Sequence, residues 1–178
     1  MCIVGRSIFE KLNAELSIVT PYSKDMMDGD GYVLTTKNDI TINYLEHINL
    51  VSKEIVFVPP NYVAHLTAKS KFGRMGISFL NAAKVHSGFV GRLALEVVNM
   101  SNKRTPVKLS RDDPFMHFEL MSREGTPSPY EGAYMFQFMD DSEVDKYMKI
   151  LSERFPNEYQ LPMLKNRAKN RIMDIEEI

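Results

Sequence analysis

The chain has 178 residues, a formal net charge of −1 and a single cysteine, Cys2. This length suits one domain with a substantial core, and the balanced charge excludes a global field that would draw the protein to nucleic acid or membranes. One cysteine excludes an internal disulfide, and no apolar run approaches the ~20 residues of a membrane span. We therefore expect a globular cytoplasmic domain that binds neither nucleic acid nor membranes.

The first predicted element is a short N-terminal helix. Ser7 and Glu10 have the spacing of a capping box, in which each side chain caps a backbone N–H of the first turn. Three apolar residues then recur at helical spacing and predict the buried side of this helix: Phe9, Leu12 and Leu16.

From Gly31 onward the pattern indicates β-structure. Residues 32–34 and 40–44 alternate in polarity across a Lys37-Asn38-Asp39 turn, which predicts a hairpin. Further short runs follow, bounded by Gly, Pro, Asn or Ser, at residues 54–58, 62–66, 77–80, 93–98, 107–109, 115–120 and 134–138. Many short strands without intervening helices predict an antiparallel sandwich or barrel rather than a parallel α/β sheet.

After Asp140 the pattern becomes helical. Ser142 and Asp145 are expected to cap a helix with apolar residues at the i, i+3, i+4, i+7 spacing: Val144, Tyr147, Met148 and Leu151. A second helix is predicted from Pro162, and its polar face carries Lys165, Arg167, Lys169 and Arg171. That face is either a phosphate-binding patch or, as we favour, an ordinary polar face of a helix packed on the core. We divide the chain into a β domain, residues 1–140, and a helical C-terminal extension packed on it, residues 141–178.

Several familiar catalytic signatures are missing. His117-Phe118-Glu119 forms an H-x-E triplet, but the P-C-x-x-C segment that completes a zinc deaminase site is absent. The glycine-rich loops of nucleotide-binding α/β folds and the G-x-S-x-G turn of hydrolases are absent as well. We therefore expect no zinc and no cysteine nucleophile.

The stretch from Lys69 to Glu96 carries the strongest chemical signal. Ser70 and Arg74 are four residues apart and share one face if this segment is helical. Glu96 lies in the apolar strand L-A-L-E-V-V, where an ionised carboxylate is costly to bury unless it is paired or functional. Glu96 is thus either a structural acid paired with Arg74 or Arg92, or a catalytic group.

Three ordered motifs resemble one known family. Residues 59–76 read P-x3-V-x2-L-x2-K-S-x3-R-x-G, residues 85–99 read V-H-S-G-F-x-G-R-L-x-L-E-x2-N, and residues 129–137 read P-Y-E-G-A-Y-x2-Q. Their order and spacing resemble those of the dCTP deaminase branch of the trimeric dUTPase superfamily. The resemblance covers roughly residues 5–138.

The resemblance implies a distorted β-barrel or jelly roll that assembles as a homotrimer with active sites between subunits. It also implies zinc-independent hydrolysis of the cytosine 4-amino group of dCTP, giving dUTP and ammonia. Glu96 matches the family's general base, which activates water and then delivers a proton to the leaving ammonia. Arg74 and Ser70 match the residues that position this water and the glutamate.

The expected substrate-binding residues also follow from the resemblance. Lys69 and Ser70 lie where the family binds the triphosphate, and Lys71 is expected to restore the charge that is lost at Ala133. Phe89 takes the place of an aromatic residue that packs on the deoxyribose. Ala82 matches a position whose backbone carbonyl orients the water or the amine. The remaining assignments are Val85 and His86 in the second motif, and Tyr130 and Gln137 in a C-terminal lid. Mg²⁺ is expected to arrive with the triphosphate rather than in a protein cage.

Two departures from the family pattern keep alternatives open. His86 stands where the family has the aspartate that orients water for phosphate hydrolysis, and Ala133 replaces a phosphate-binding lysine. The first alternative is a bifunctional deaminase and pyrophosphatase that yields dUMP and pyrophosphate, which the segment from Tyr130 to Gln137 favours and His86 opposes. The second is a non-catalytic module that binds nucleotide or a protein partner.

Overall fold

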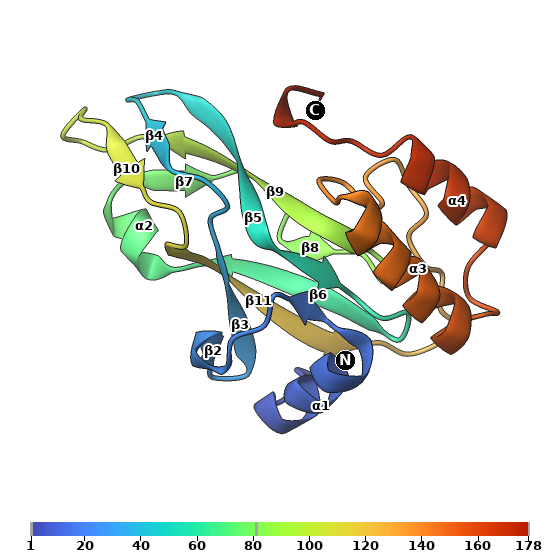
Figure 1. The fold of residues 1–178 in the computed structure, drawn as a ribbon. Helices are drawn as coiled ribbons and strands as arrows, with labels where there is room; N and C mark the ends of the chain where they lie inside the picture. Colours follow the sequence, from blue (N-terminus) through green and yellow to red (C-terminus); the bar gives the residue numbers. More distant parts are fainter. Residues whose placement is uncertain (1, 81, 178) are drawn as a thin grey trace.

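Two large antiparallel sheets form the centre of the computed structural model, which describes residues 2–80 and 82–177 (Figure 1). The first sheet has the order β1-β5-β9-β7, with bounds Val19–Thr20, His47–Phe57, Val90–Asn99 and Ile77–Phe79. The second has the order β2-β3-β11-β6-β8, with bounds Met27–Asp28, Gly31–Thr35, Pro114–Ser122, Tyr62–Ala68 and Lys84–Val85. A small sheet pairs β10 (Val107–Leu109) with β4 (Ile40–Ile42).

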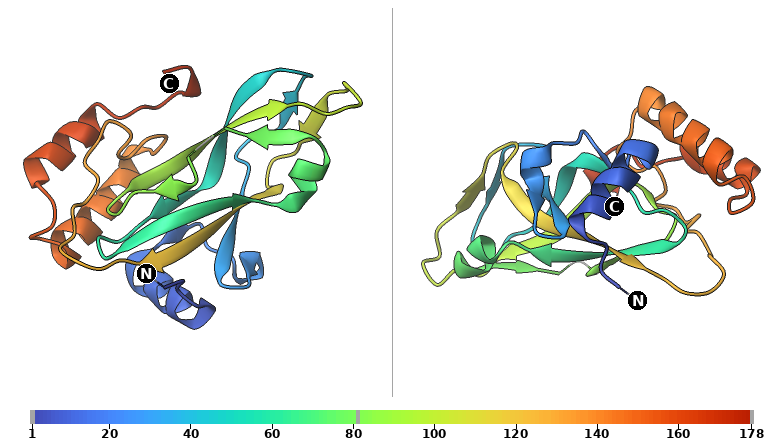
Figure 2. Two further views of the ribbon diagram at one scale, coloured as in Figure 1. Left: turned by 180° about the vertical axis from the view of Figure 1, so that it is seen from behind. Right: turned by 90° about the horizontal axis from the view of Figure 1, so that it is seen from below.

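The helices lie at the periphery of these sheets (Figure 2). Their bounds are Arg6–Leu16 for α1, Ser70–Arg74 for α2, Asp141–Arg154 for α3 and Leu161–Lys169 for α4, with short 3₁₀ turns η1 at Lys24–Met26 and η2 at Ile175–Glu177. The predicted all-β architecture with an N-terminal helix and a helical C-terminal segment is therefore confirmed. The sheets of the described residues are open and do not close into a barrel.

Helix α1 begins earlier than its predicted cap. Gly5 is the N-cap residue, so the capping box predicted at Ser7 is wrong, and Glu10 instead forms an i, i+4 ion pair with Arg6 at 3.1 Å. The predicted inner side is correct. Phe9 is fully buried, stacks on Tyr32 and meets Phe118 edge-on, which attaches α1 to the second sheet.

The hairpin predicted across residues 37–39 is wrong. β3 pairs with β2 and β11, whereas β4 pairs with β10, so the two segments belong to different sheets. The chain leaves the second sheet at Thr36, whose hydroxyl donates to the carbonyl of Ser110. Alternation in polarity reports that a segment is half-buried, but it does not identify the partner strand.

The strand predicted at residues 134–138 is also wrong. This segment is a series of turns, and Phe136 and Phe138 have φ angles of 64° and 57°. The positive φ angles place both aromatic rings in the interior although the backbone is not extended. The alternating aromatic residues were therefore a sign of burial rather than of a strand.

Helix α3 attaches the C-terminal residues to the first sheet. Its capping box is formed by Asp140 and Glu143 rather than by the predicted Ser142. The guanidinium of Arg92 in β9 donates to both carboxylate oxygens of Glu143 at 2.8 Å, and Tyr147 packs edge-on against Phe57 of β5. No helix of the described residues is long and apolar enough to cross a membrane.

Candidate active site

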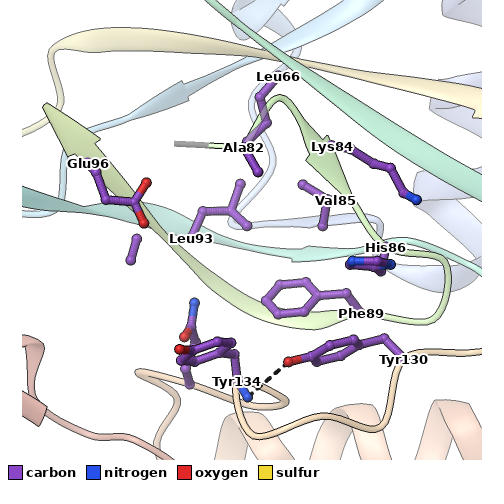
Figure 3. Close-up of a pocket in the computed structure, with 12 residues that line it drawn as sticks. Leu66, Ala82, Lys84, Val85, His86, Phe89, Leu93, Glu96, Tyr130 and Tyr134 are labelled. Atoms are coloured by element: carbon purple, nitrogen blue, oxygen red, sulfur yellow. Dashed lines mark hydrogen bonds between the residues drawn. The ribbon is translucent and has the colours of Figure 1, made fainter. Parts of the chain in front are cut away.

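A cavity of about 380 Å³ opens between β9, the β8–β9 turn and the segment that precedes α3 (Figure 3). β9 contributes Leu93, Ala94 and Glu96 to its wall, and β8 contributes Lys84 and Val85. Tyr130 and Tyr134 close it from the opposite side. A volume of this order can take a nucleoside or a small nucleotide.

This cavity brings together most of the predicted site residues. Glu96 lines it, and so do the predicted substrate-binding residues Ala82, Val85, His86, Phe89, Tyr130 and Gln137. These residues come from two stretches of the chain that are far apart in sequence, residues 82–96 and 130–137. This arrangement is what the second and third sequence motifs imply.

Glu96 has no partner for one of its carboxylate oxygens. Its Oε2 is buried and accepts no hydrogen bond, and Glu96 forms no ion pair with any residue in the described ranges. The structural alternative, in which Arg92 neutralises Glu96, is wrong because Arg92 is bound to Glu143. A partly buried carboxylate facing a cavity without a counter-charge is typical of a functional group rather than a structural one.

An aromatic wall faces Glu96 across the cavity. The rings of His86 and Tyr130 are stacked, with centroids 5.6 Å apart, and Phe89 lies 5.8 Å from Tyr130 in a tilted arrangement. The amide of Tyr130 donates to the carbonyl of Ser87 at 2.7 Å. Gly88 has φ +81°, and a Cβ there would lie 2.5 Å from Pro129, so only glycine permits this close approach.

Gln137 lines the cavity but is also part of the framework. Its side-chain amide nitrogen donates to the backbone carbonyl of Arg92 at 2.7 Å, and the backbone N–H of Arg92 donates to the backbone carbonyl of Gln137. The side chain is buried. Gln137 therefore fixes the segment before α3 against β9, and its side-chain oxygen and second amide N–H remain to contact a ligand.

The polar and charged residues of the first motif do not line this cavity. Ser70 and Arg74 lie exposed on α2, and the side chain of Arg74 makes no hydrogen bond or ion pair within residues 2–80 and 82–177. Lys69 donates to Asp28 at 2.8 Å, and Lys71 lies over the ring of Phe72. Within one chain, the cavity that Glu96 lines therefore does not include Ser70, Arg74 or the two lysines.

Five lining residues were not predicted: Leu66, Lys84, Leu93, Ala94 and Tyr134. Lys84 is the only lysine or arginine on the described cavity wall, which makes it a candidate contact for a phosphate. Tyr134 lies inside the third motif, and its amide donates to the hydroxyl of Tyr130 at 3.2 Å. Position within the motifs was thus an available signal for Leu66, Leu93 and Tyr134, whereas Lys84 immediately precedes the second motif.

The described residues contain no group of three or more His, Cys, Asp or Glu side chains arranged to hold a metal ion. The H-x-E residues of β11 have other contacts. His117 bonds to Asp28 at 2.9 Å, and Glu119 lies 3.8 Å from His65. The hydrogen bonds from Lys69 and His117 hold the pKa of the Asp28 carboxyl below its usual value.

Comparisons with known proteins agree with the architecture and the motifs. Residues 13–121 match the family described as dCTP deaminase-like. A dCTP deaminase of Metallosphaera sedula is 30% identical over 119 residues, which are 66% of each chain. A probable deoxyuridine 5′-triphosphate nucleotidohydrolase of Sulfolobus islandicus rod-shaped virus 1 is 29% identical over 154 residues, covering 77% of this chain and 94% of the viral protein.

The same fold is seen in a solved structure. The 2′-deoxycytidine 5′-triphosphate deaminase from Agrobacterium tumefaciens superposes with a TM-score of 0.58 at 15% identity, covering 86% of this chain and 53% of that one. The likeness at this identity concerns the fold.

Proposed function

Since the chain belongs to the dCTP deaminase-like family, we propose that it hydrolyses the 4-amino group of dCTP to give dUTP and ammonia. The observation that carries this proposal is the unpaired, buried carboxylate oxygen of Glu96 at the wall of a nucleotide-sized cavity. Such a carboxylate can accept a proton from a water molecule held between it and the cytosine ring.

Glu96 acts twice in this reaction. It takes a proton from water while the water oxygen bonds to C4 of cytosine, which gives a tetrahedral intermediate. It then delivers that proton to the 4-amino nitrogen, the C4–N bond breaks, and ammonia leaves, while the second proton of the water ends on N3 of the uracil ring. The products are dUTP and NH₃, so dCTP and one water account for all atoms.

Ser70 and Arg74 act from a second copy of the chain. Both are exposed on α2, outside the cavity of their own chain. Exposed apolar side chains surround the end of β9 that carries Glu96: Leu45, Leu80 and Met100. Such a surface favours contact with another protein, and we propose a homotrimer in which each copy supplies α2 to its neighbour's cavity.

The aromatic wall takes the nucleoside. Phe89 packs on the deoxyribose, Tyr130 and His86 line the same side, and the carbonyl of Ala82 orients the amine or the water. Lys84 lies within reach of the phosphates, and Lys69 and Lys71 arrive with the neighbour's α2. Mg²⁺ accompanies the triphosphate, since the described residues offer no cluster of acidic ligands.

The bifunctional alternative has specific support. The viral relative is named as a probable nucleotidohydrolase of deoxyuridine triphosphate, which is the second of the two activities, and its match covers more of this chain than that of the Metallosphaera deaminase. Against it, His86 is stacked on Tyr130 and presents no carboxylate to water. The third alternative, a non-catalytic module, does not explain an unpaired Glu96.

Product analysis separates these functions. The protein is incubated with dCTP and Mg²⁺, and the products are resolved by anion-exchange chromatography. We expect dUTP and an equal amount of ammonia. Formation of dUMP and pyrophosphate would favour the bifunctional enzyme. Unchanged dCTP, with dCMP unchanged as well, would contradict the deaminase assignment.

A further inference from the structure

The C-terminal helices lie against the outer side of the cavity wall. In Figure 1, α3 and α4 cover the segment that runs from Pro129 to α3, which carries Tyr130 and Gln137. Residues in and just before α4 form hydrogen bonds with this wall at two places. One place is the β8–β9 turn, and the other is the segment around Tyr130. These contacts bear on whether that segment is a mobile lid.

The first contact is made by Tyr159. Its hydroxyl donates to the carbonyl of Gly88 at 3.0 Å, and its ring is 6% exposed. Gly88 belongs to the turn between His86 and Phe89, both of which line the cavity. Tyr159 thus supports the aromatic wall from behind, without touching the cavity itself.

The second contact is made at Glu131, the neighbour of Tyr130. The guanidinium of Arg167 in α4 donates to the carbonyl of Glu131 at 2.9 Å, and the amide of Gln160 donates to the carboxylate of Glu131 at 2.7 Å. The backbone that carries Tyr130 is therefore bonded to the helical extension on one side. On the other side it is bonded to Ser87.

Together these contacts leave the ring of Tyr130 little freedom. Its hydroxyl accepts from the amide of Tyr134, its face stacks on His86, and Gly132 lies directly against its hydroxyl end. A segment with this many fixed contacts is a preformed wall, whereas a lid needs contacts that break easily. The helical extension supplies the outer half of these contacts.

We propose that Tyr159 and Arg167 are positioning residues of the nucleotide site, which hold the aromatic wall in the conformation that binds the nucleoside. The inference rests on the proposed function and extends it to residues outside the family match, which ends at residue 121. A wall fixed before binding lowers the ordering cost of the complex, so the contribution appears in substrate affinity rather than in the chemical step.

The chain offers a matched control for Tyr159. Tyr147 is also a buried tyrosine of the extension, and its hydroxyl donates to the carbonyl of Ser17 at 2.7 Å. It packs on Phe57 and is not part of the cavity wall. Tyr147→Phe and Tyr159→Phe each remove one buried hydroxyl, so a purely structural role predicts the same result for both.

The experiment measures Tm, kcat and KM for dCTP in both variants, and the equilibrium Kd for dCTP in a Glu96→Gln background. We expect both variants to lower Tm, and Tyr147→Phe at least as much as Tyr159→Phe, because the hydroxyl of Tyr147 also bonds to that of Thr20 at 2.9 Å. Only Tyr159→Phe should raise KM and Kd, by about tenfold, with kcat changed by less than about twofold. Arg167→Met should raise KM in the same direction, and Lys165→Met, on the exposed face of α4, should not.

Two results would overturn the inference. The first is that the wild-type protein deaminates dCTP but Tyr159→Phe and Tyr147→Phe have equal KM and Kd values. The helical extension would then stabilise the fold without positioning the site. The proposed function would stand in that case. If the wild-type protein neither binds nor deaminates a deoxycytidine nucleotide, the proposed function fails and the inference fails with it.

Discussion

Asn49 of β5 and Glu96 of β9 lie directly opposite each other, and each has a buried side-chain oxygen that accepts no hydrogen bond within the described residues. Opposite residues of an antiparallel pair share a face, with Cβ atoms about 5 Å apart. Because these two side-chain oxygens have no donor within the described residues, their hydrogen-bond donors are expected to come from outside this chain. We infer that water, substrate or the guanidinium of a neighbour's Arg74 supplies them.

The first prediction concerns this pair. Asn49→Asp places a second carboxylate opposite Glu96, and repulsion between like charges favours protonation, whereas the proposed mechanism needs Glu96 ionised. The acid side of the pH–activity profile should move to higher pH by about one unit. Asn157→Asp adds the same charge at an exposed position and should leave the pH–activity profile unchanged. An unchanged profile in both variants would show that Asn49 does not act on Glu96.

The second prediction tests whether one site combines two copies. Arg74→Ala and Glu96→Gln should each be inactive as pure proteins. After the two are unfolded together and refolded, random assembly should leave about a quarter of the sites with both native residues, so about a quarter of wild-type activity should return. A mixture as inactive as its components would show that Arg74 and Glu96 serve no common site between copies.

The third prediction concerns the ring of Tyr130. A Cβ at Gly132 would lie 2.4 Å from the hydroxyl of Tyr130, so Gly132→Ala should push the ring toward the cavity. KM for dCTP should rise about tenfold, and Tm should fall, because the displaced ring loses the hydrogen bond from Tyr134 and the stacking on His86. Gly5→Ala, where the added Cβ meets Asp30 at an ordinary 3.6 Å, is the control and should keep the wild-type KM.

The fourth prediction concerns the attachment of α3 at low pH. The hydrogen bonds from Arg92 lower the pKa of Glu143 below its usual value of 4.5. A lowered folded-state pKa means that this contribution to stability is complete above about pH 4.5 and is lost as the pH falls through the folded value. Urea unfolding at several pH values should show the loss.

A pair of variants isolates that attachment. Glu143→Gln should cost about 2 kcal/mol at pH 7, because it leaves the largely buried Arg92 without its counter-charge, and the cost should shrink on acidification. Glu153→Gln breaks the exposed pair with Lys149 on the same helix and should cost less than about 0.5 kcal/mol at any pH. Equal costs for the two variants would contradict the role of Arg92.

The cavity could be predicted from the sequence because its residues lie in ordered motifs. Phe89, Glu96 and Tyr130 each stand at a fixed place in a motif, and the fold brings those places together. The neighbours of Glu96 across the sheet could not be predicted in this way. Asn49 faces Glu96 only through the register of β5 and β9, and periodicity does not specify which strands pair.

Two further features lay beyond sequence patterns for physical reasons. Ser70 and Arg74 share a helical turn as predicted, but whether they meet Glu96 depends on assembly, which no single-chain pattern encodes. Tyr159 lies in a segment with no motif, and the role that we propose for it rests on one long-range hydrogen bond to Gly88. Side-chain spacing predicts local structure, whereas such contacts depend on the packed fold.

The most direct test of the account is ammonia release from dCTP by Glu96→Gln, measured together with the binding of dCTP to the same variant. Glutamine keeps the size of the side chain but cannot accept the proton from water. We predict that the variant binds dCTP within about threefold of the wild-type Kd, while ammonia release falls by about a thousandfold or more. Ammonia release at the wild-type rate by a variant that binds dCTP normally would contradict the assignment of Glu96 as the general base.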